Sequence, residues 1–225
     1  MRAFIFPIFF FLTLFPAASQ ENTLPNGFVF LDEVIPDISL EVRYAGENNF
    51  MGIVVAGYIS PKVVLTTQAA QALKQVQREL KTLGYCIKAF DGYRPQRAVN
   101  HFISWAKISG DTLMKKQFYP DVDKKDLFNL GYISSRSGHS RGSTIDLTII
   151  NARTGEEVDM GGPYDFFGEL SHHNYKDISK VQKTNRQLLK MAMMKYGFQP
   201  YAKEWWHYTF QPEPFPETYF DFVVE

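Results

Sequence analysis

Cysteine is almost absent from this sequence of 225 residues, which contains only Cys86. A single cysteine excludes an intrachain disulfide, and no base near it in the sequence favours a nucleophilic role. An excess of charge of either sign is absent too, because 24 Lys and Arg residues balance 24 Asp and Glu residues. This balance argues against a broad nucleic-acid footprint and against a polybasic patch for anionic lipid. We therefore expect a small molecule or a zwitterion as the partner.

Long hydrophobic runs are scarce, and the longest apolar stretch lies at the N-terminus, over residues 3–15. It is shorter than the roughly 20 residues that span a bilayer. A positive charge precedes it and small residues follow it, which is typical of a secretory signal peptide. We predict a signal peptide over residues 1–19, cleaved near Ala18 or Ser19, with an uncleaved membrane anchor as the alternative. The mature chain, residues 20–225, is then exported to the periplasm or secreted, without stable membrane insertion.

Periodic patterns predict both helices and strands. Ala69, Leu73, Val76 and Leu80 recur at helical spacing, and Gly84 follows them. Helices are predicted over residues 66–83, 94–107 and 179–196, and strands over 28–42, 85–90, 144–150 and 205–210. Helices and strands mix without a βαβ repeat, so we predict a single α+β domain with a mostly antiparallel central sheet flanked by helices.

Two segments concentrate residues that bind metals. His139 and Asp146 flank Gly142, which lets the backbone turn between them, and His207 lies near the end of the chain. Two imidazoles and one carboxylate leave a fourth position open, which is the pattern of a catalytic zinc site. Each of these residues taken singly is more often structural than ligating. Their combination predicts one metal site.

Glu204 precedes His207 by three residues. Residues three apart on an extended strand point to opposite faces. Both side chains can reach one site only if Glu204 lies in a turn or at the entrance of the strand. In that position Glu204 can act as the general base for a water molecule.

The order of the motifs resembles a known family. Ser-x-His-x-x-Gly-x-x-x-Asp at residues 137–146, followed by Glu-x-x-His at 204–207, is similar to the zinc D-Ala-D-Ala metallopeptidases, a superfamily shared with hedgehog-like domains. Asp-Gly-Tyr-Arg-Pro at 91–95 and Ser-His-His at 171–173 narrow the likeness to the D-alanyl-D-alanine dipeptidases of vancomycin-resistance clusters. The likeness covers nearly all of the mature chain in family order.

The resemblance implies one Zn²⁺ per chain, held by His139, Asp146 and His207, with Glu204 as the catalytic base. It implies that Arg94 stabilises the developing oxyanion, although a purely structural pair with Asp91 is the alternative. It further implies that Asp165 holds the substrate ammonium, and that Tyr44 and Ser137 line the ends of the substrate.

A few positions depart from the family pattern. Thr144 stands where Ala is common, and its hydroxyl is expected to bond Asp146 or to narrow the pocket. Gly168 and Leu170 stand where acidic residues are usual, which questions the ammonium side of the site. Of the other histidines, His101 is expected to be structural, and His172 or His173 is expected at most to orient a ligand or the substrate, not to bind the metal.

The function expected from this resemblance is zinc-dependent hydrolysis of D-Ala-D-Ala or a close dipeptide. A D,D-carboxypeptidase acting on cell-wall stem peptides is the first alternative, and Asp165 argues against it because a carboxylate there favours a free ammonium. A zinc-bearing binding module without turnover is the second alternative. Glu204 and Arg94 argue against that module, because metal binding alone needs neither. The sequence leaves the oligomeric state open.

Overall fold

The computed structural model describes residues 24–225, so the predicted signal peptide lies outside the described residues. The helices are α1 (Leu31–Val34), α2 (Thr67–Thr82), α3 (Gln96–Ala106), α4 (Lys115–Phe118) and α5 (Lys180–Lys195). The strands are β1 (Phe28–Phe30), β2 (Ser39–Leu40), β3 (Val64–Thr66), β4 (Tyr85–Asp91), β5 (Thr144–Asn151), β6 (Phe198–Pro200) and β7 (His207–Phe210). No helix among residues 24–225 combines the length and apolar character that a membrane crossing requires.

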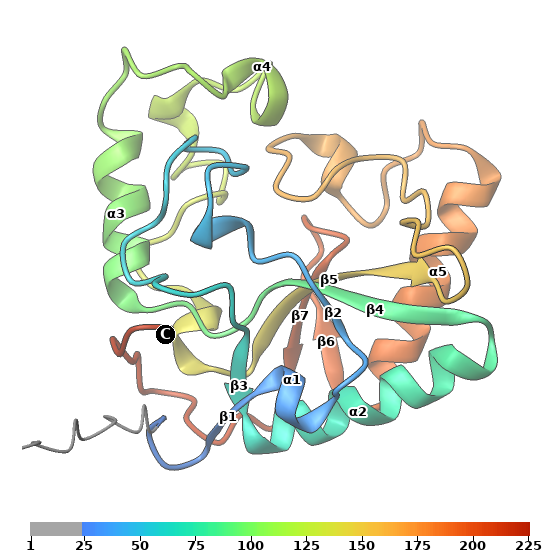
Figure 1. Ribbon diagram of the computed structural model, residues 1–225. Helices are drawn as coiled ribbons and strands as arrows, with labels where there is room; N and C mark the ends of the chain where they lie inside the picture. The colour runs from blue at the N-terminus through green and yellow to red at the C-terminus, as the bar shows by residue number, and fades with distance from the viewer. Residues whose placement is uncertain (1–23) are drawn as a thin grey trace, which may run out of the picture.

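A five-stranded sheet forms the centre of the fold, with the strand order β2-β4-β5-β7-β6 (Figure 1). Its neighbouring strands are antiparallel, except that β2 runs parallel to β4. Strands β1 and β3 pair separately in a two-stranded sheet. The predicted α+β class and the mostly antiparallel sheet are therefore confirmed.

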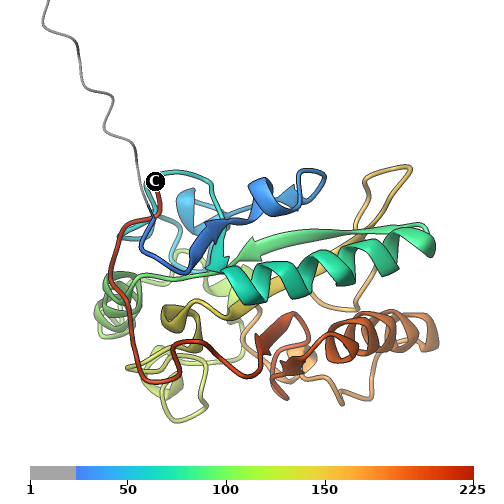
Figure 2. The same ribbon diagram turned by 90° about the horizontal axis from the view of Figure 1, so that it is seen from below.

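Helices α2 and α5 lie side by side along one face of the sheet (Figures 1 and 2). On β5, Ile145, Leu147 and Ile149 are fully buried and share one face by strand alternation. Asp146 lies on the opposite face by the same alternation, and Figure 1 shows mainly loops on that side of the sheet. A register shift in β4 between Ala89 and Asp91 pairs Asp91 with Asp146 across the two strands. The sheet thus brings two carboxylates together on the face that carries the loops.

The two long helices follow the predicted patterns. The apolar positions predicted for α2 are buried, including Leu73, Val76 and Leu80. Helix α5 begins with a capping box, in which the Ser179 hydroxyl accepts from the Gln182 amide while the Gln182 side chain accepts from the Ser179 amide. This reciprocal pair satisfies two backbone donors that a helix start leaves free.

Two predicted strands differ from the structure. The segment 28–42 is not one strand: β1 and β2 are short, and α1 lies between them. Near the C-terminus the strand begins at His207 rather than at Trp205, and β6, which no apolar pattern indicated, lies beside it. Short strands at sheet edges carry too few residues for a period of two to be read from the sequence.

Candidate active site

His139 lies in a short 3-10 turn, Gly138–Arg141, that leads into β5. The Ser137 hydroxyl caps this turn by accepting from the His139 backbone N–H at 3.3 Å. The His139 ring contacts the Gly92 carbonyl through Nδ1 at 2.7 Å. Because a carbonyl only accepts, Nδ1 carries a proton, so Nε2 is the ring nitrogen that can offer a lone pair to a metal. The Nε2 atom faces Asp146 and His207.

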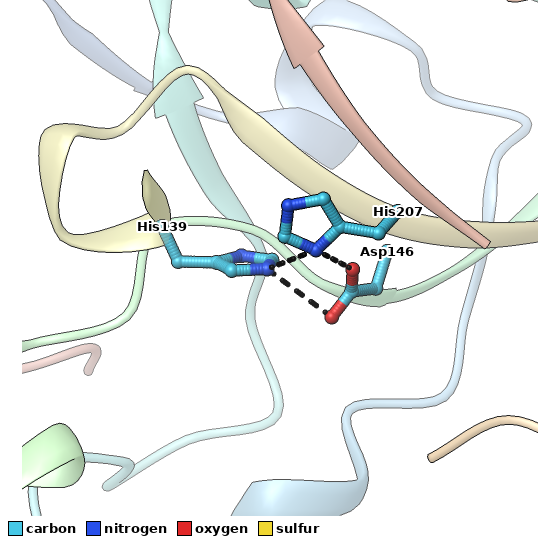
Figure 3. Close-up of side chains that lie close together, drawn as sticks. All are labelled: His139, Asp146 and His207. Atoms are coloured by element: carbon cyan, nitrogen blue, oxygen red, sulfur yellow. Dashed lines mark hydrogen bonds and ion pairs between the residues drawn. The ribbon is translucent and has the colours of Figure 1, made fainter. Parts of the chain in front are cut away.

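The three predicted metal ligands converge, as Figure 3 shows. The His139 Nε2 atom lies 3.2 Å from Asp146 Oδ2 and 3.3 Å from His207 Nδ1, and His207 Nδ1 lies 3.0 Å from Asp146 Oδ1. Ligand atoms at about 2.0–2.1 Å from a tetrahedral zinc are roughly 3.3–3.5 Å apart. The spacing and the donor types therefore fit a zinc ion, with the fourth direction open to the pocket.

The charges of the cluster favour a cation at this point. Burial of Asp146 opposes its ionised form, but the His139 and His207 rings outweigh it, so the pKa of Asp146 lies well below its usual range. Burial likewise opposes a charged His207 ring, yet the hydrogen bond to Asp146 and the nearby Glu204 raise the pKa of His207 to about 10. The buried carboxylate thus attracts positive charge to the position between the two rings.

Glu204 lies in the turn that precedes β7, and His207 is the first residue of that strand. The Glu204 Oε2 atom is 3.3 Å from His207 Nδ1, and both residues line the same pocket. The backbone closes the turn, since the His207 N–H donates to the Glu204 carbonyl. The condition set by the spacing is met, because Glu204 reaches the site from a turn rather than from the strand.

Arg94 makes the ion pair with Asp91 and also faces the pocket. Its guanidinium donates to Asp91 Oδ2 at 2.8–2.9 Å and lies 3.5 Å from Asp146 Oδ2, and it also lines the pocket. The Tyr58 hydroxyl donates to the other Asp91 oxygen at 2.6 Å. Burial lowers the pKa of Arg94, but the surrounding acidic groups outweigh burial and raise it well above its usual value. The ion pair with Asp91 holds a permanent cation at the pocket wall.

Asp165 lies on another wall of the pocket, where the Tyr44 hydroxyl donates to its Oδ2 at 2.7 Å. Its backbone is in the left-handed region, with φ of 64°, which is uncommon for residues other than glycine. Burial raises the pKa of Asp165 to about 8, although the Tyr44 hydrogen bond lowers it. A strained backbone and a buried carboxylate both indicate a functional position.

One pocket of about 270 Å³ lies at the centre of this arrangement. The eight residues predicted for the site all line it: Tyr44, Arg94, Ser137, His139, Asp146, Asp165, Glu204 and His207. The volume is just below the roughly 300–1,000 Å³ of pockets for drug-sized ligands. The pocket therefore suits a small polar molecule.

Curated proteins resemble the chain over most of its length. Residues 25–225 match the family model described as D-Ala-D-Ala dipeptidase. The D-alanyl-D-alanine dipeptidases of Enterococcus faecalis and Streptomyces coelicolor are 44% and 42% identical to it, each over 89% of this chain and 100% of the relative. This chain belongs to the D-Ala-D-Ala dipeptidase family. The D-alanyl-D-alanine dipeptidase of Escherichia coli is 30% identical over 80% of this chain and 82% of its own length.

The departures from the family pattern do not alter the pocket wall. The Thr144 hydroxyl pairs with the Thr209 hydroxyl across β5 and β7 at 2.9 Å, so the expected bond to Asp146 is wrong. Thr144, Gly168 and Leu170 do not line the pocket. Asp165 and Tyr44 line it instead.

The remaining histidines lie outside the pocket. His101 accepts from the Ala56 backbone N–H, which confirms its structural role. Burial lowers the pKa of His173 to about 4. His172 contributes its backbone carbonyl to Arg186 rather than its ring to the site. Neither of these two side chains reaches the metal cluster.

Tyr164 is a site residue that sequence patterns missed. Its hydroxyl donates to Asp146 Oδ2 at 3.3 Å, and its ring stacks on Phe90. It fixes the carboxylate oxygen that faces His139. The available signal was its place directly before Asp165, but a tyrosine next to a candidate residue is too common to be predictive.

The C-terminal segment ties two of the site turns together. The Phe220 N–H donates to the Ser140 carbonyl at 2.9 Å, and the Phe220 carbonyl accepts from the Gln96 N–H at 3.0 Å. Ser140 follows His139, and Gln96 begins the helix after Arg94. Phe220 thus bridges the turn that carries His139 and the turn that carries Arg94.

Gly142 gives a stability prediction. It ends the His139 turn with φ of 81°, and a Cβ there would lie 2.2 Å from the Phe28 ring. Gly142→Ala is expected to lower the free energy of unfolding by roughly 2–6 kcal/mol, from backbone strain and overpacking together. Gly155→Ala is the matched control, because φ is 74° but no atom lies within 4 Å. Urea denaturation that shows equal losses for the two variants would contradict the packing account.

Proposed function

We propose that this protein hydrolyses D-Ala-D-Ala, or a closely related dipeptide with free ends, in a zinc-dependent reaction. The observation that carries the proposal is a single small pocket that joins a metal-ligating cluster to a buried carboxylate, Asp165. The D-alanyl-D-alanine dipeptidases among its relatives support the same substrate.

One Zn²⁺ per chain would be held by His139, Asp146 and His207. When bound there, zinc supplies Lewis acidity, which polarises a peptide carbonyl and acidifies water. The hydrogen bond from His139 Nδ1 to the Gly92 carbonyl fixes the ring orientation that binding requires. The Tyr164 hydroxyl orients the Asp146 carboxylate in the same way.

Glu204 is the proposed general base and acid. Its carboxylate takes a proton from the attacking water and passes it to the leaving amine as the C–N bond breaks. Arg94 donates hydrogen bonds to the oxygen that becomes negative when the carbonyl carbon turns tetrahedral. The Asp91 ion pair supports this role, because it orients the guanidinium before the substrate arrives.

Each charged end of the dipeptide is expected to meet a different part of the pocket. Asp165, with the Tyr44 hydroxyl, would take the substrate ammonium, and Ser137 would line the other end. A buried carboxylate pairs well with an ammonium but poorly with the neutral amide of a longer peptide. This arrangement favours free dipeptides over stem peptides.

The test compares release of D-Ala from D-Ala-D-Ala and from a cell-wall tripeptide that ends in D-Ala-D-Ala. Purified mature protein is assayed with zinc and with chelator. Zinc-dependent cleavage of the dipeptide alone is expected. Equal or faster cleavage of the tripeptide would favour a D,D-carboxypeptidase, and stoichiometric zinc without turnover of either would favour a binding module.

Proton release tests the role of Asp165. With its pKa at about 8, Asp165 is mostly protonated at pH 7 in the free protein, whereas a bound ammonium favours the carboxylate. Binding of a non-hydrolysable dipeptide analogue at pH 7 is expected to release about one proton. Calorimetry in buffers of different ionisation enthalpy measures this release. Asp165→Asn should abolish it, and release that persists in this variant would contradict the assignment.

The same pKa has a consequence for stability. The folded-state pKa of Asp165 is raised from 3.8 to about 8, so the folded protein holds a proton that the unfolded chain loses near pH 4. The contribution of this group to stability is fully present below pH 4 and is lost as the pH rises to 8. The advantage of Asp165→Asn over wild type in melting temperature should therefore grow between pH 5 and pH 9.

We also propose that the protein is exported and acts on dipeptides derived from the cell wall. The proposal rests on the charged, apolar and small-residue pattern of residues 1–19. Cell fractionation with mass measurement of the mature N-terminus tests it. A chain found in the cytosol with residues 1–19 intact would contradict it.

A further inference from the structure

Arg186 is a buried cation on α5 that has no ion pair within residues 24–225. Only 3% of its surface is exposed. Its guanidinium donates three hydrogen bonds, all to backbone carbonyls: Nε to Met160 at 2.6 Å, Nη1 to His172 at 2.8 Å and Nη2 to Leu170 at 2.9 Å. Burial lowers its pKa to about 10. A buried charge is costly unless hydrogen bonds satisfy it. Here all three accepting carbonyls belong to residues 160–172.

The three carbonyls belong to the two ends of the 160–172 loop. Met160 begins the loop, and Leu170 and His172 end it. The single planar guanidinium of Arg186 therefore joins the two ends of the loop. Lysine could not reproduce this, because its ammonium is a point charge without the fixed fork of donors.

The middle of the same loop carries Asp165. Within the loop, the Ser171 hydroxyl donates to the Phe166 carbonyl at 2.5 Å. The Phe167 N–H ties the loop to α4 by donating to the Phe118 carbonyl at 2.7 Å. The left-handed backbone at Asp165 persists only if the surroundings enforce it. Closure of both loop ends supplies that constraint, and the Tyr44 hydroxyl holds the Asp165 carboxylate in place by donating a hydrogen bond to it.

We propose that Arg186 is a positioning residue that sets the preference for substrates with a free amino terminus, acting through Asp165. The inference rests on the proposed dipeptidase function. Arg186 does not line the pocket, so it reaches the substrate only through its neighbours. These are the loop, which accepts its three hydrogen bonds, and the Trp205 ring, whose centroid lies 5.9 Å from the guanidinium carbon. The hydrogen bonds of Arg186 go to the loop and not to β5, β7 or the His139 turn, which carry the proposed metal ligands. The loop meets that side of the site through the bond from the Trp205 N–H to the Ser171 carbonyl at 2.9 Å and through the bond from the Tyr164 hydroxyl to Asp146.

Packing of α5 does not require this charge. Leu189, Ala192 and Met193 already bury the helix face, and the capping box fixes its start. A hydrophobic side chain of similar volume in place of a buried cation is often neutral for stability or better. A guanidinium at this position therefore points to a geometric requirement of the loop.

A double-mutant cycle tests the proposal, with Arg186→Lys, Asp165→Asn and the combined variant. For D-Ala-D-Ala, Arg186→Lys is expected to raise KM roughly 10- to 100-fold, with a smaller change in kcat, because the carboxylate moves from its place. In the Asp165→Asn background, the same substitution should change KM by less than about twofold, because its effect passes through the missing carboxylate. Equal changes of KM in both backgrounds would overturn the proposal.

Arg141→Lys is the matched control. Arg141 is a partly buried arginine that also donates three side-chain hydrogen bonds, but these go to Glu213 and Tyr219 on the C-terminal segment. Arg141→Lys should change KM by the same factor in the wild-type and the Asp165→Asn backgrounds. Coupling of Arg141 to Asp165 as strong as that of Arg186 would show a general loss of structure and would overturn the specific role.

Ser171→Ala and dissociation constants provide two further tests. Ser171→Ala removes only the bond to the Phe166 carbonyl, so it should raise KM in the same direction by a smaller factor, even if Arg186→Lys does not fold. An unchanged KM for Ser171→Ala together with an unfolded Arg186→Lys would count against loop positioning. Dissociation constants from calorimetry are measured beside turnover. Wild-type protein that binds D-Ala-D-Ala without cleaving it would end the hydrolytic proposal, while the cycle in dissociation constants would still decide the role of Arg186.

Discussion

Replacing Glu204 by Gln is expected to lower kcat for D-Ala-D-Ala by roughly 10²- to 10⁴-fold, the usual contribution of a positioned proton-transfer group. Gln keeps the shape of the side chain but cannot take a proton from water. Glu204 lies in the turn before His207, and its Oε2 atom is 3.3 Å from His207 Nδ1. It is not among the three proposed ligands. Zinc content should therefore remain at one per chain, as measured by metal analysis beside steady-state kinetics.

Glu156→Gln is the control for this variant. Glu156 is exposed in the hairpin after β5 and lies outside the pocket. Its kinetics should match those of the wild type. A Glu204→Gln variant that retains more than about a tenth of the wild-type kcat would contradict its role as the base. Loss of zinc from that variant would instead make Glu204 a ligand.

Replacing His139 by Ala is expected to remove both the metal and the activity. The variant lacks the Nε2 atom that lies within 3.3 Å of both other ligand atoms, and Ala offers no substitute. Zinc affinity should fall by more than the roughly 10- to 100-fold that loss of an outer hydrogen bond costs. Competition with a chromogenic chelator measures the affinity, and D-Ala release measures the activity.

His172→Ala provides the matched histidine control. The His172 ring does not line the pocket, and its carbonyl contact to Arg186 is preserved in the variant. Zinc affinity should stay at the wild-type value. A fall in zinc affinity equal to that of His139→Ala would show that the metal binds elsewhere.

Much of the fold could be predicted because its longest elements repeat a pattern. Helix α2 buries residues at helical spacing, and β5 alternates apolar residues with Asp146. The segment 28–42 could not be predicted, because a two-residue strand and a four-residue helix are decided by tertiary contacts. Strand β6 is similarly short, and its pairing with β7 defines it.

The candidate site was predictable where its residues are close in sequence. His139 and Asp146 are joined by one turn and one strand, and Glu204 and His207 by another turn. The pair of Arg94 with Asp91, three residues apart, was one of the alternatives that the sequence allowed. The bond from the Tyr58 hydroxyl to the same carboxylate is a long-range contact that no spacing reveals. The interaction of Arg186 with both ends of one loop is also a long-range contact.

Titration of the metal-free protein with zinc tests the central claim most directly. Dipeptidase activity on D-Ala-D-Ala should rise linearly with added zinc and reach its plateau at one ion per chain, because one cluster of three ligands serves one pocket. His139→Ala should show no rise over the same range. Full activity in chelator, or a plateau only at two ions per chain, would contradict the account.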